Sequence, residues 1–410
     1  MYSYIISPRD SSNISHALYA IPIALKDIWC HVLMPMRDAA RAACLSHAFL
    51  RSWRCHPNLT LIWALLKPGI EKLNLYLYKK YNFPCSLFSD GVRNSIRDLQ
   101  LDTCVFRPTS ELGPLRRLTS LNLSSVRITG DELECLLSNS LALEQLELYS
   151  CKEVIFLNIP CVLQQLNRLT VLDCYRLQTV ECKAPNISII DFSGDNIKLS
   201  FGQLLKMKEL DMHQSDAVCY ACAELPSIMP NLETLLIGSG IEVVNAPITK
   251  FLYLKHLTIL ISERTFSPPY NYFSLVYFFD ASPSLETFFL DVPHEDVKHE
   301  SVFGASSHLG ELPEQQHNCL KIVEIIGFSS AKSLVELTCC IVKNAVSLEC
   351  LTLDTLRISG EANKTCWPIS NDELKEASRA VVAIRMYIEH RVAPTSKLTV
   401  LEPCTRCHSR

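Results

Sequence analysis

The chain has 410 residues, and its 39 basic and 43 acidic residues give a formal net charge of −4. With a pI near 6.3, it lacks the basic character that is usual for a general nucleic-acid-binding protein. No stretch of the sequence approaches the roughly 18 consecutive apolar residues that a membrane-spanning helix needs. We therefore expect neither nucleic acid nor a membrane as a partner.

The sequence contains 19 cysteines, an odd number, scattered without the regular spacing of a small disulfide-bonded scaffold. The first ten residues, M-Y-S-Y-I-I-S-P-R-D, have neither the basic region nor the apolar core of a secretion signal. We therefore expect reduced thiols and a location in the cytoplasm, the nucleus or both.

Residues 1–20 are expected to form a disordered leader, and residues 21–57 differ from them in kind. This second segment contains no glycine, and alanine and other apolar residues recur in it at helical spacing. Its five basic residues outnumber its two acidic ones, which leaves the segment near +3. We expect a small all-helical module that docks on another surface, because so short a chain buries little apolar area alone.

A nine-residue pattern organises the rest of the chain and is clearest at Leu143–Cys151, L-E-Q-L-E-L-Y-S-C. It matches the strand segment of a leucine-rich repeat, L-x-x-L-x-L-x-x-N/C. Copies of the pattern begin at Ile70, Ile96, Leu118, Leu143, Leu169, Ile187, Met207, Leu232, Leu254, Leu285, Leu320 and Leu348. Most successive starts are separated by the roughly 20–29 residues typical of this repeat class. The fold class predicted for residues 58–356 is therefore α/β, a leucine-rich-repeat solenoid of horseshoe form.

Positions within the repeat predict which side chains are buried. The fourth and sixth residues alternate onto one face of a short strand and point into the stack, which single repeats cannot complete alone. Cys104 and Cys151 occupy the ninth position, where a small residue turns inward as the chain leaves the strand. We expect both to be packed thiols.

The third, fifth and seventh positions are predicted to face the concave side of the solenoid, where a protein target would bind. The residues predicted there are Asp98, Gln100, Asp102, Asn122, Glu147, Asp173, Asp191, Glu209 and Asp211. Farther along the chain the fifth position becomes more apolar, at Leu236, Thr258 and Phe289. Two interpretations stay open: ordinary solvated polarity, or a surface complementary to a basic segment of a target.

Two insertions interrupt the repeats. The aromatic run after Ser-Pro-Pro within residues 261–284 predicts a short helix on the outer side, and residues 292–319 are expected to form an exposed loop. After the last repeat, residues 357–410 are predicted to close the stack with a helix from about Asn371 to Arg391 and a K-L-T-V-L strand.

Motifs of phosphate binding and of nucleophilic catalysis are absent from the sequence. Residues 294–299 resemble H-E-x-x-H but contain one residue too many for the two histidines to share a helical face. The Cys-x-x-Cys pairs at 219–222 and 404–407 have the gap of zinc ligands, but zinc needs four ligands in one place. We expect no metal, no cofactor and no catalytic residue.

Residues 34–54 resemble the second half of the F-box of plant F-box/leucine-rich-repeat proteins, where the usual pattern is L-P-x-R-D-A-A-R, L-S-x-x-W/F and a further Trp. The matching residues are Pro35, Arg37, Asp38, Arg41, Leu45, Ser46, Phe49 and Trp53. Segments at 330–339, 347–354 and 401–408 also resemble that family.

The resemblance implies a non-catalytic substrate receptor of an SCF-type ubiquitin ligase. In that role the box binds a Skp1-type adapter, and through it a cullin, while the repeats hold a protein target. The residues implied to contact the adapter are Ile28, Val32, Leu33, Pro35, Leu45, Ser46, Phe49 and Trp53.

The first half of the box departs from the family's pattern. Leu25-Lys26-Asp27 lacks the proline of the usual Leu-Pro-x-Asp opening, and about two residues are missing between Ile28 and Pro35. A slip of one residue turns helix side chains by about 100°, so we expect weakened adapter binding. The alternative hypothesis is a leucine-rich-repeat scaffold that has lost its ligase connection.

Overall fold

The computed structural model describes residues 5–7, 69–77, 81–109, 112–195, 197–240, 249–261, 270–293, 300–304, 309–310, 312–356 and 370–403. The F-box-like module predicted at residues 21–57 lies outside them. The chain divides into two compact units. Unit 1 comprises Met1–Pro185 and Ile197–Ser200, and unit 2 comprises Asn186–Asn196 and Phe201–Arg410.

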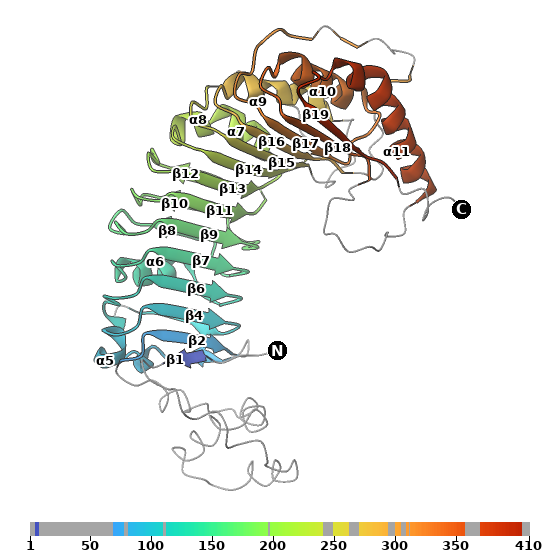
Figure 1. Ribbon diagram of the computed structural model, residues 1–410. Helices are drawn as coiled ribbons and strands as arrows, with labels where there is room; N and C mark the ends of the chain where they lie inside the picture. Colours follow the sequence, from blue (N-terminus) through green and yellow to red (C-terminus); the bar gives the residue numbers. More distant parts are fainter. Residues whose placement is uncertain are drawn as a thin grey trace, which may run out of the picture. The chain divides into compact units, whose positions relative to one another are not determined.

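Unit 1 is built on a sheet in which the strands are ordered β1-β2-β4-β6-β7-β9 (Figure 1). These strands are β1 Ile5–Ser7, β2 Lys72–Tyr76, β4 Asp98–Asp102, β6 Ser120–Ser124, β7 Gln145–Tyr149 and β9 Arg168–Leu172. The strands from β2 to β9 pair in parallel. β1 pairs antiparallel with β2, so Ile5–Ser7 form a strand within the expected disordered leader.

The other elements of this part of the chain are short. They are β3 Asn82–Phe83, η2 Cys85–Leu87, α5 Asp90–Arg93, β5 Val105–Phe106, α6 Gly130–Ser138, β8 Phe156–Ile159, β10 Thr179–Cys182 and β12 Lys198–Phe201. β8, β10 and β12 form a second sheet, and β3 pairs with β5.

Unit 2 continues the same construction with a parallel sheet ordered β11-β13-β14-β15-β16-β17-β18-β19. Its strands are β11 Ile189–Ser193, β13 Glu209–His213, β14 Thr234–Ser239, β15 His256–Ile261, β16 Thr287–Asp291, β17 Ile322–Ile326, β18 Cys350–Asp354 and β19 Lys397–Leu401. Its helices are α7 Ala217–Ala223, α8 Leu225–Ile228, η4 Tyr272–Leu275, α9 Val276–Ala281, α10 Lys332–Asn344, α11 Asn371–Ala383, η5 Ile384–Ile388 and η6 Glu389–Arg391.

The inward positions of the repeat stack on one another from strand to strand. In unit 1, Leu121 pairs in register with Leu146, and Leu123 with Leu148, and all four are fully buried. Burying one leucine contributes about 1.5–3 kcal/mol, and each repeat supplies two such positions. The parallel register and this burial confirm the predicted α/β repeat solenoid.

One predicted repeat was placed three residues out of register. β9 pairs Leu169 with Leu146 and Val171 with Leu148, so this repeat begins at Leu166 rather than at Leu169. The sequence L-N-R-L-T-V-L-D-C of residues 166–174 admits both alignments, since leucines three residues apart occur twice, at 166/169 and at 169/172. The observed register keeps the carboxylate of Asp173 out of the strand.

The chain leaves successive strands of unit 1 through the same backbone conformation. The eighth residues of four repeats, Thr103, Ser125, Ser150 and Asp173, all have positive φ between 52° and 57°. This left-handed conformation is uncommon for residues other than glycine, and here it turns the next residue inward.

The ninth residues are Cys104, Val126, Cys151 and Cys174, and all of them are buried. The thiol of Cys151 donates to the carbonyl of Leu123 over 3.3 Å, which joins two neighbouring repeats. Burial, and secondarily the carboxylate of Asp102, raises the pKa of Cys104 to about 12. The expectation of packed thiols at Cys104 and Cys151 is confirmed, and the register correction adds Cys174.

Both insertions of unit 2 contribute buried residues or helices that pack against other elements of the unit. The first contains η4 and α9, as the aromatic run predicted, and η4 packs on α10. In the second, Val302 and His317 are buried, so the prediction of an exposed loop is wrong for these residues. His317 lies against the ring of Phe279, and its backbone amide donates to the carbonyl of Asn344.

The C-terminal helix and strand occur where the sequence predicted them. Ser370, rather than Asn371, is the N-cap of α11, and its hydroxyl and amide exchange hydrogen bonds with Glu373. The helical path continues through a π-helical turn, η5, and ends at Arg391. β19 then pairs with β18 as the last strand of the sheet.

The inward and outward assignment can be tested on β7. Leu146→Asp places an unpaired carboxylate among buried leucines and is expected to cost several kcal/mol of unfolding free energy. Gln145→Ala, on the exposed neighbouring position, is expected to cost about 0.5 kcal/mol or less. Urea denaturation measures both, and equal losses would contradict the assignment.

A second test concerns His317. Burial lowers the pKa of its imidazole, and Asp280, at 4.0 Å, opposes this only in part. As the pH falls, His317 is therefore protonated at a higher pH in the unfolded chain than in the folded one. Protonation then favours unfolding, so the free energy of unfolding is expected to decrease below about pH 6.5.

His317→Gln should remove this part of the pH dependence, because glutamine takes up no proton. Unfolding free energies measured between about pH 5 and 8 compare the variant with His390→Gln, which changes an exposed histidine. An unchanged decrease in the His317 variant would show that other groups cause it.

Candidate functional site: the open face of the sheet

The third, fifth and seventh positions of the repeats form one side of each sheet, which we call the open face. Alternation along a strand puts these side chains opposite the buried fourth and sixth positions. In unit 1 the open face consists of Lys72, Asn74, Tyr76, Asp98, Gln100, Asp102, Ser120, Asn122, Ser124, Gln145, Glu147, Tyr149, Arg168, Thr170 and Leu172. Most of them are half-buried, as expected for side chains packed side by side.

The register brings the predicted residues of unit 1 together. Gln100, Asn122 and Glu147 are successive partners on β4, β6 and β7, so they lie in one row across the sheet. Asn122 donates its amide hydrogen to Glu147 over 2.5 Å. Asp98 and Asp102 flank Gln100 on β4 and complete a polar, acidic face.

Cations compensate only part of this acidity. Lys72 forms an ion pair with Asp98 at 2.7 Å, and Tyr149 donates its hydroxyl to Glu147 at 3.5 Å. Asp102 accepts a hydrogen bond from the hydroxyl of Thr103. A basic segment bound to this face would therefore meet the carboxylates of Asp102 and Glu147, which hold hydrogen bonds but, among the described residues, form no ion pair.

Asp173 does not lie on the open face, so its predicted placement there is wrong. It follows β9 in a left-handed turn with φ 57°, and Thr170 takes the row position next to Glu147. The physical reason is the register of this repeat, which starts at Leu166.

Asp191, Glu209 and Asp211 lie on the open face of unit 2, as predicted. Asp191 and Asp211 are register partners on β11 and β13. His213, which the repeat pattern did not predict as a site residue, lies on the same face, with its Nε2 2.9 Å from an oxygen of Asp211. The signal was Gly238 at the seventh position of the next strand: a Cβ there would lie 1.9 Å from His213 Nδ1.

The rest of the open face of unit 2 becomes more apolar, as the fifth positions predicted. Leu236 and Phe289 lie there, and the third and seventh positions add Leu260, Ile322 and Ile326. These apolar residues come from later repeats than Asp191, Glu209 and Asp211, and Asp291 and Glu324 lie among them.

The residues at the second position form a charged ladder along the strand starts of unit 2. Glu233 binds both Lys208 and Lys255, and these cations lower the pKa of Glu233, Lys208 foremost. Glu286 and Lys321 form the next pair at 3.0 Å. Because these opposite charges alternate and pair with one another, they stabilise neighbouring repeats and offer few unpaired charges to a charged ligand.

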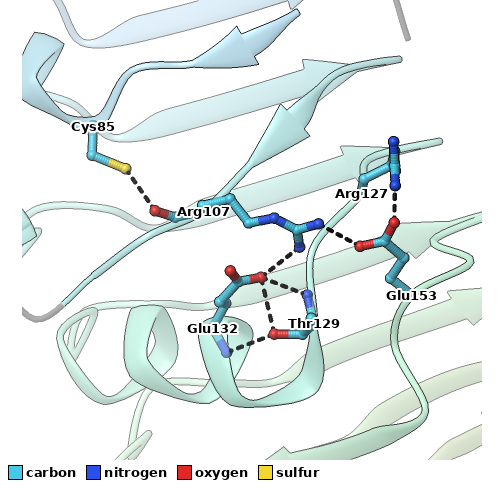
Figure 2. Close-up of polar contacts among 6 residues, drawn as sticks. All are labelled: Cys85, Arg107, Arg127, Thr129, Glu132 and Glu153. Carbon is cyan, nitrogen blue, oxygen red and sulfur yellow. Dashed lines mark hydrogen bonds and ion pairs between the residues drawn. The ribbon is translucent and has the colours of Figure 1, made fainter. Parts of the chain in front are cut away.

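A polar cluster ties together the segments that follow three strands of unit 1 (Figure 2). Arg107 donates to Glu132 over 2.7 Å and to Glu153 over 2.5 Å, and Glu153 also accepts from Arg127. Glu132 completes the capping box of Thr129, and the Cys85 thiol donates to the carbonyl of Arg107. Arg107, followed by Arg127, lowers the pKa of Glu153. We call this set the Arg107 clamp, and its mutual pairing gives it a structural role.

The adapter-contacting residues implied by the resemblance stay predictions. All of them, Ile28, Val32, Leu33, Pro35, Leu45, Ser46, Phe49 and Trp53, lie outside the described residues. Cys219 and Cys222 belong to α7, whereas Cys404 and Cys407 are outside the described part. Within that part, no group of three or more His, Cys, Asp or Glu could hold a metal ion. No described helix is both long and apolar enough to cross a membrane.

Comparison with known proteins now decides the family. The model of the At1g61320/AtMIF1 leucine-rich-repeat domain matches residues 55–405. The chain belongs to this family. The match begins just after the residues that resemble the F-box, so it covers the repeats and the C-terminal helix and strand rather than the box.

A plant protein supports the same assignment. The putative FBD-associated F-box protein At1g61330 of Arabidopsis thaliana is 24% identical over 318 residues, which cover 72% of this chain and 70% of that protein. A leucine-rich repeat protein from Bacteroides ovatus is 11% identical, with a TM-score of 0.14, and the comparison covers 82% of this chain and 95% of that one. The family match and the Arabidopsis relative confirm the resemblance to plant F-box/FBD/leucine-rich-repeat proteins.

The Arg107 clamp yields a stability prediction for this family member. Glu153→Ala leaves Arg107 and Arg127 without their shared carboxylate, and we expect a loss of about 1–2 kcal/mol in urea denaturation. Glu314→Ala breaks a single, largely exposed pair with Lys343 and should cost less than about 0.5 kcal/mol. A loss for Glu153→Ala no larger than for Glu314→Ala would remove the structural role of the clamp.

Proposed function

We propose that this protein is the substrate-recognition subunit of an SCF-type ubiquitin ligase. The observation that carries the proposal is the combination, in one chain, of an F-box-like segment with a repeat domain of the F-box/FBD family. The segment at residues 21–57 binds a Skp1-type adapter, and through it a cullin, while the repeats bind a protein target. The chain itself is non-catalytic and uses no cofactor, because the partner subunits transfer ubiquitin.

The second half of the box carries the adapter contact. Leu45, Phe49 and Trp53 are each four residues apart, so in a helix they form one apolar stripe. Such a stripe serves both the packing of the small module and the surface that meets the adapter. A buried leucine or aromatic residue at the centre of an interface typically costs about 2 kcal/mol or more when truncated.

The open face of unit 1 is the proposed site for the target. It presents Asp98, Asp102 and Glu147 beside the uncharged Gln100 and Asn122, on strands whose register is fixed by the buried leucines. Complementary charge promotes association and selects partners. The preferred target is therefore a protein with a basic, solvent-exposed segment, met in the cytoplasm or the nucleus.

A second candidate function is a leucine-rich-repeat scaffold without ligase activity. The observation that favours it is the departure of the box at Lys26 and the shortened segment between Ile28 and Pro35. In this alternative the open face binds the same kind of partner, but no ubiquitin is transferred.

A pull-down with a purified Skp1-type adapter separates the two functions. We expect weak but measurable binding of the full chain, abolished by Leu45→Ala combined with Trp53→Ala, since truncating one such interface residue typically costs about 2 kcal/mol or more. Lys26→Pro, with two residues inserted before Leu33, should strengthen binding because it restores the family's first helix.

Circular dichroism controls for the fold, because the variants must retain the spectrum of the natural chain. Absence of adapter binding in both the natural and the restored chain would remove the ligase function and leave the scaffold.

A further inference from the structure

A surface hollow of about 490 Å³ lies in unit 2 beside the C-terminal helix α11. Its lining residues are Ser301, Phe303, Gly304, Ser378, Arg379 and Val382. The first three come from the segment 300–304 and the others from α11. The hollow is separate from the open face, and the following inference does not depend on adapter binding.

Both walls of the hollow are attached to one residue, Ser330. The amide of Val302 donates to the carbonyl of Ser330, and the two hydroxyls of Ser301 and Ser330 lie 2.9 Å apart. The amide of Ser330 donates to the carboxylate of Glu376 on α11 over 2.7 Å. The hollow is thus preformed by hydrogen bonds, which lowers the ordering cost of binding.

The hollow exposes large apolar side chains that the fold does not use. Phe303 is 41% exposed and Val382 is 47% exposed, and Met386, one turn farther along the helical path, is 55% exposed. The opposite side of α11 is buried through Ala377 and Val381. Phe303 and Val382 therefore offer an apolar contact to a partner's side chain.

Arg379 adds a positive charge with a weak intramolecular partner. Lys375 and Arg385, on the same helical path, each contact a carboxylate at 2.8 Å, in Asp372 and Glu402. Arg379 instead lies 3.8 Å from Glu376, whose carboxylate already accepts the Ser330 amide. An arriving carboxylate would form the closer, two-pronged contact that a guanidinium favours.

We propose that this hollow binds a short segment of a partner protein in which an acidic residue lies within two positions of a large apolar one. The acidic side chain pairs with Arg379, and the apolar side chain packs between Phe303 and Val382. The hydroxyl of Ser378 already donates to the carbonyl of Leu374 over 2.8 Å. The preference for a particular segment therefore comes from the charge of Arg379 and the apolar surface of Phe303 and Val382. A volume of about 490 Å³ is within the range of ligand pockets and suits two or three side chains.

A random twelve-residue peptide library displayed on phage, selected on the folded full chain, tests the proposal. We expect enriched peptides with Asp or Glu within two positions of Phe, Leu, Trp or Met. Fluorescence polarisation of one labelled enriched peptide should show at least tenfold weaker binding to Arg379→Glu and to Val382→Asp. Both positions are exposed on α11, so the fold should survive these changes.

Two controls make the result specific. Lys375→Glu changes the same charge one turn earlier, outside the lining residues, and should alter affinity less than twofold. A peptide with Lys in place of its acidic residue should bind Arg379→Glu better than the natural chain. No enrichment, enriched peptides without this pattern, or affinity for Arg379→Glu within twofold of the natural chain would overturn the proposal. Concentration-dependent dimerisation lost in Val382→Asp would assign the hollow to a second copy instead.

Discussion

Burial of the fourth and sixth repeat positions is the interaction on which the rest of this structure depends. A single repeat exposes its two leucines on one side of a five-residue strand, and only a neighbour in register covers them. Leu121 against Leu146 and Leu123 against Leu148 show this register directly. The same register fixes the outward rows, so any surface that the repeats offer to a partner is a consequence of the buried columns.

Charged and polar side chains stabilise the strands of each unit near their first or last residues. Along the strand starts of unit 2, alternating charges such as Lys208, Glu233 and Lys255 follow the repeats. At the strand ends of unit 1, left-handed eighth residues turn ninth-position cysteines inward, and the Arg107 clamp joins the loops beyond them. Charged groups in both places form ion pairs with one another, whereas Asp102 and Glu147 on the open face form hydrogen bonds and, among the described residues, no ion pair.

The repeat pattern predicted the fold class, the inward leucines and most of the open face, because burial requires a strict two-residue alternation. It misplaced Asp173 because leucines spaced by three residues occur twice in that repeat, and only strand pairing distinguishes the alignments. His213 beside Asp211 depends on the absence of a side chain at Gly238, one strand away. The hollow at Arg379 depends on contacts of Ser330 with two distant segments, which no local pattern encodes.

The function proposed above makes the protein a receptor whose repeats present a recognition surface and whose F-box-like segment at residues 21–57 connects it to the ligase. A photo-crosslinking amino acid at position 100 tests this account most directly, since Gln100 lies between Asp98 and Asp102 on the open face of unit 1. The full chain carrying it, expressed in plant cells, should crosslink to a protein with a basic segment, and the crosslinked pair should copurify with adapter and cullin. The same probe at Phe156, exposed on β8, should not capture that protein. Equal capture from both positions, or crosslinked pairs without adapter and cullin, would contradict the account.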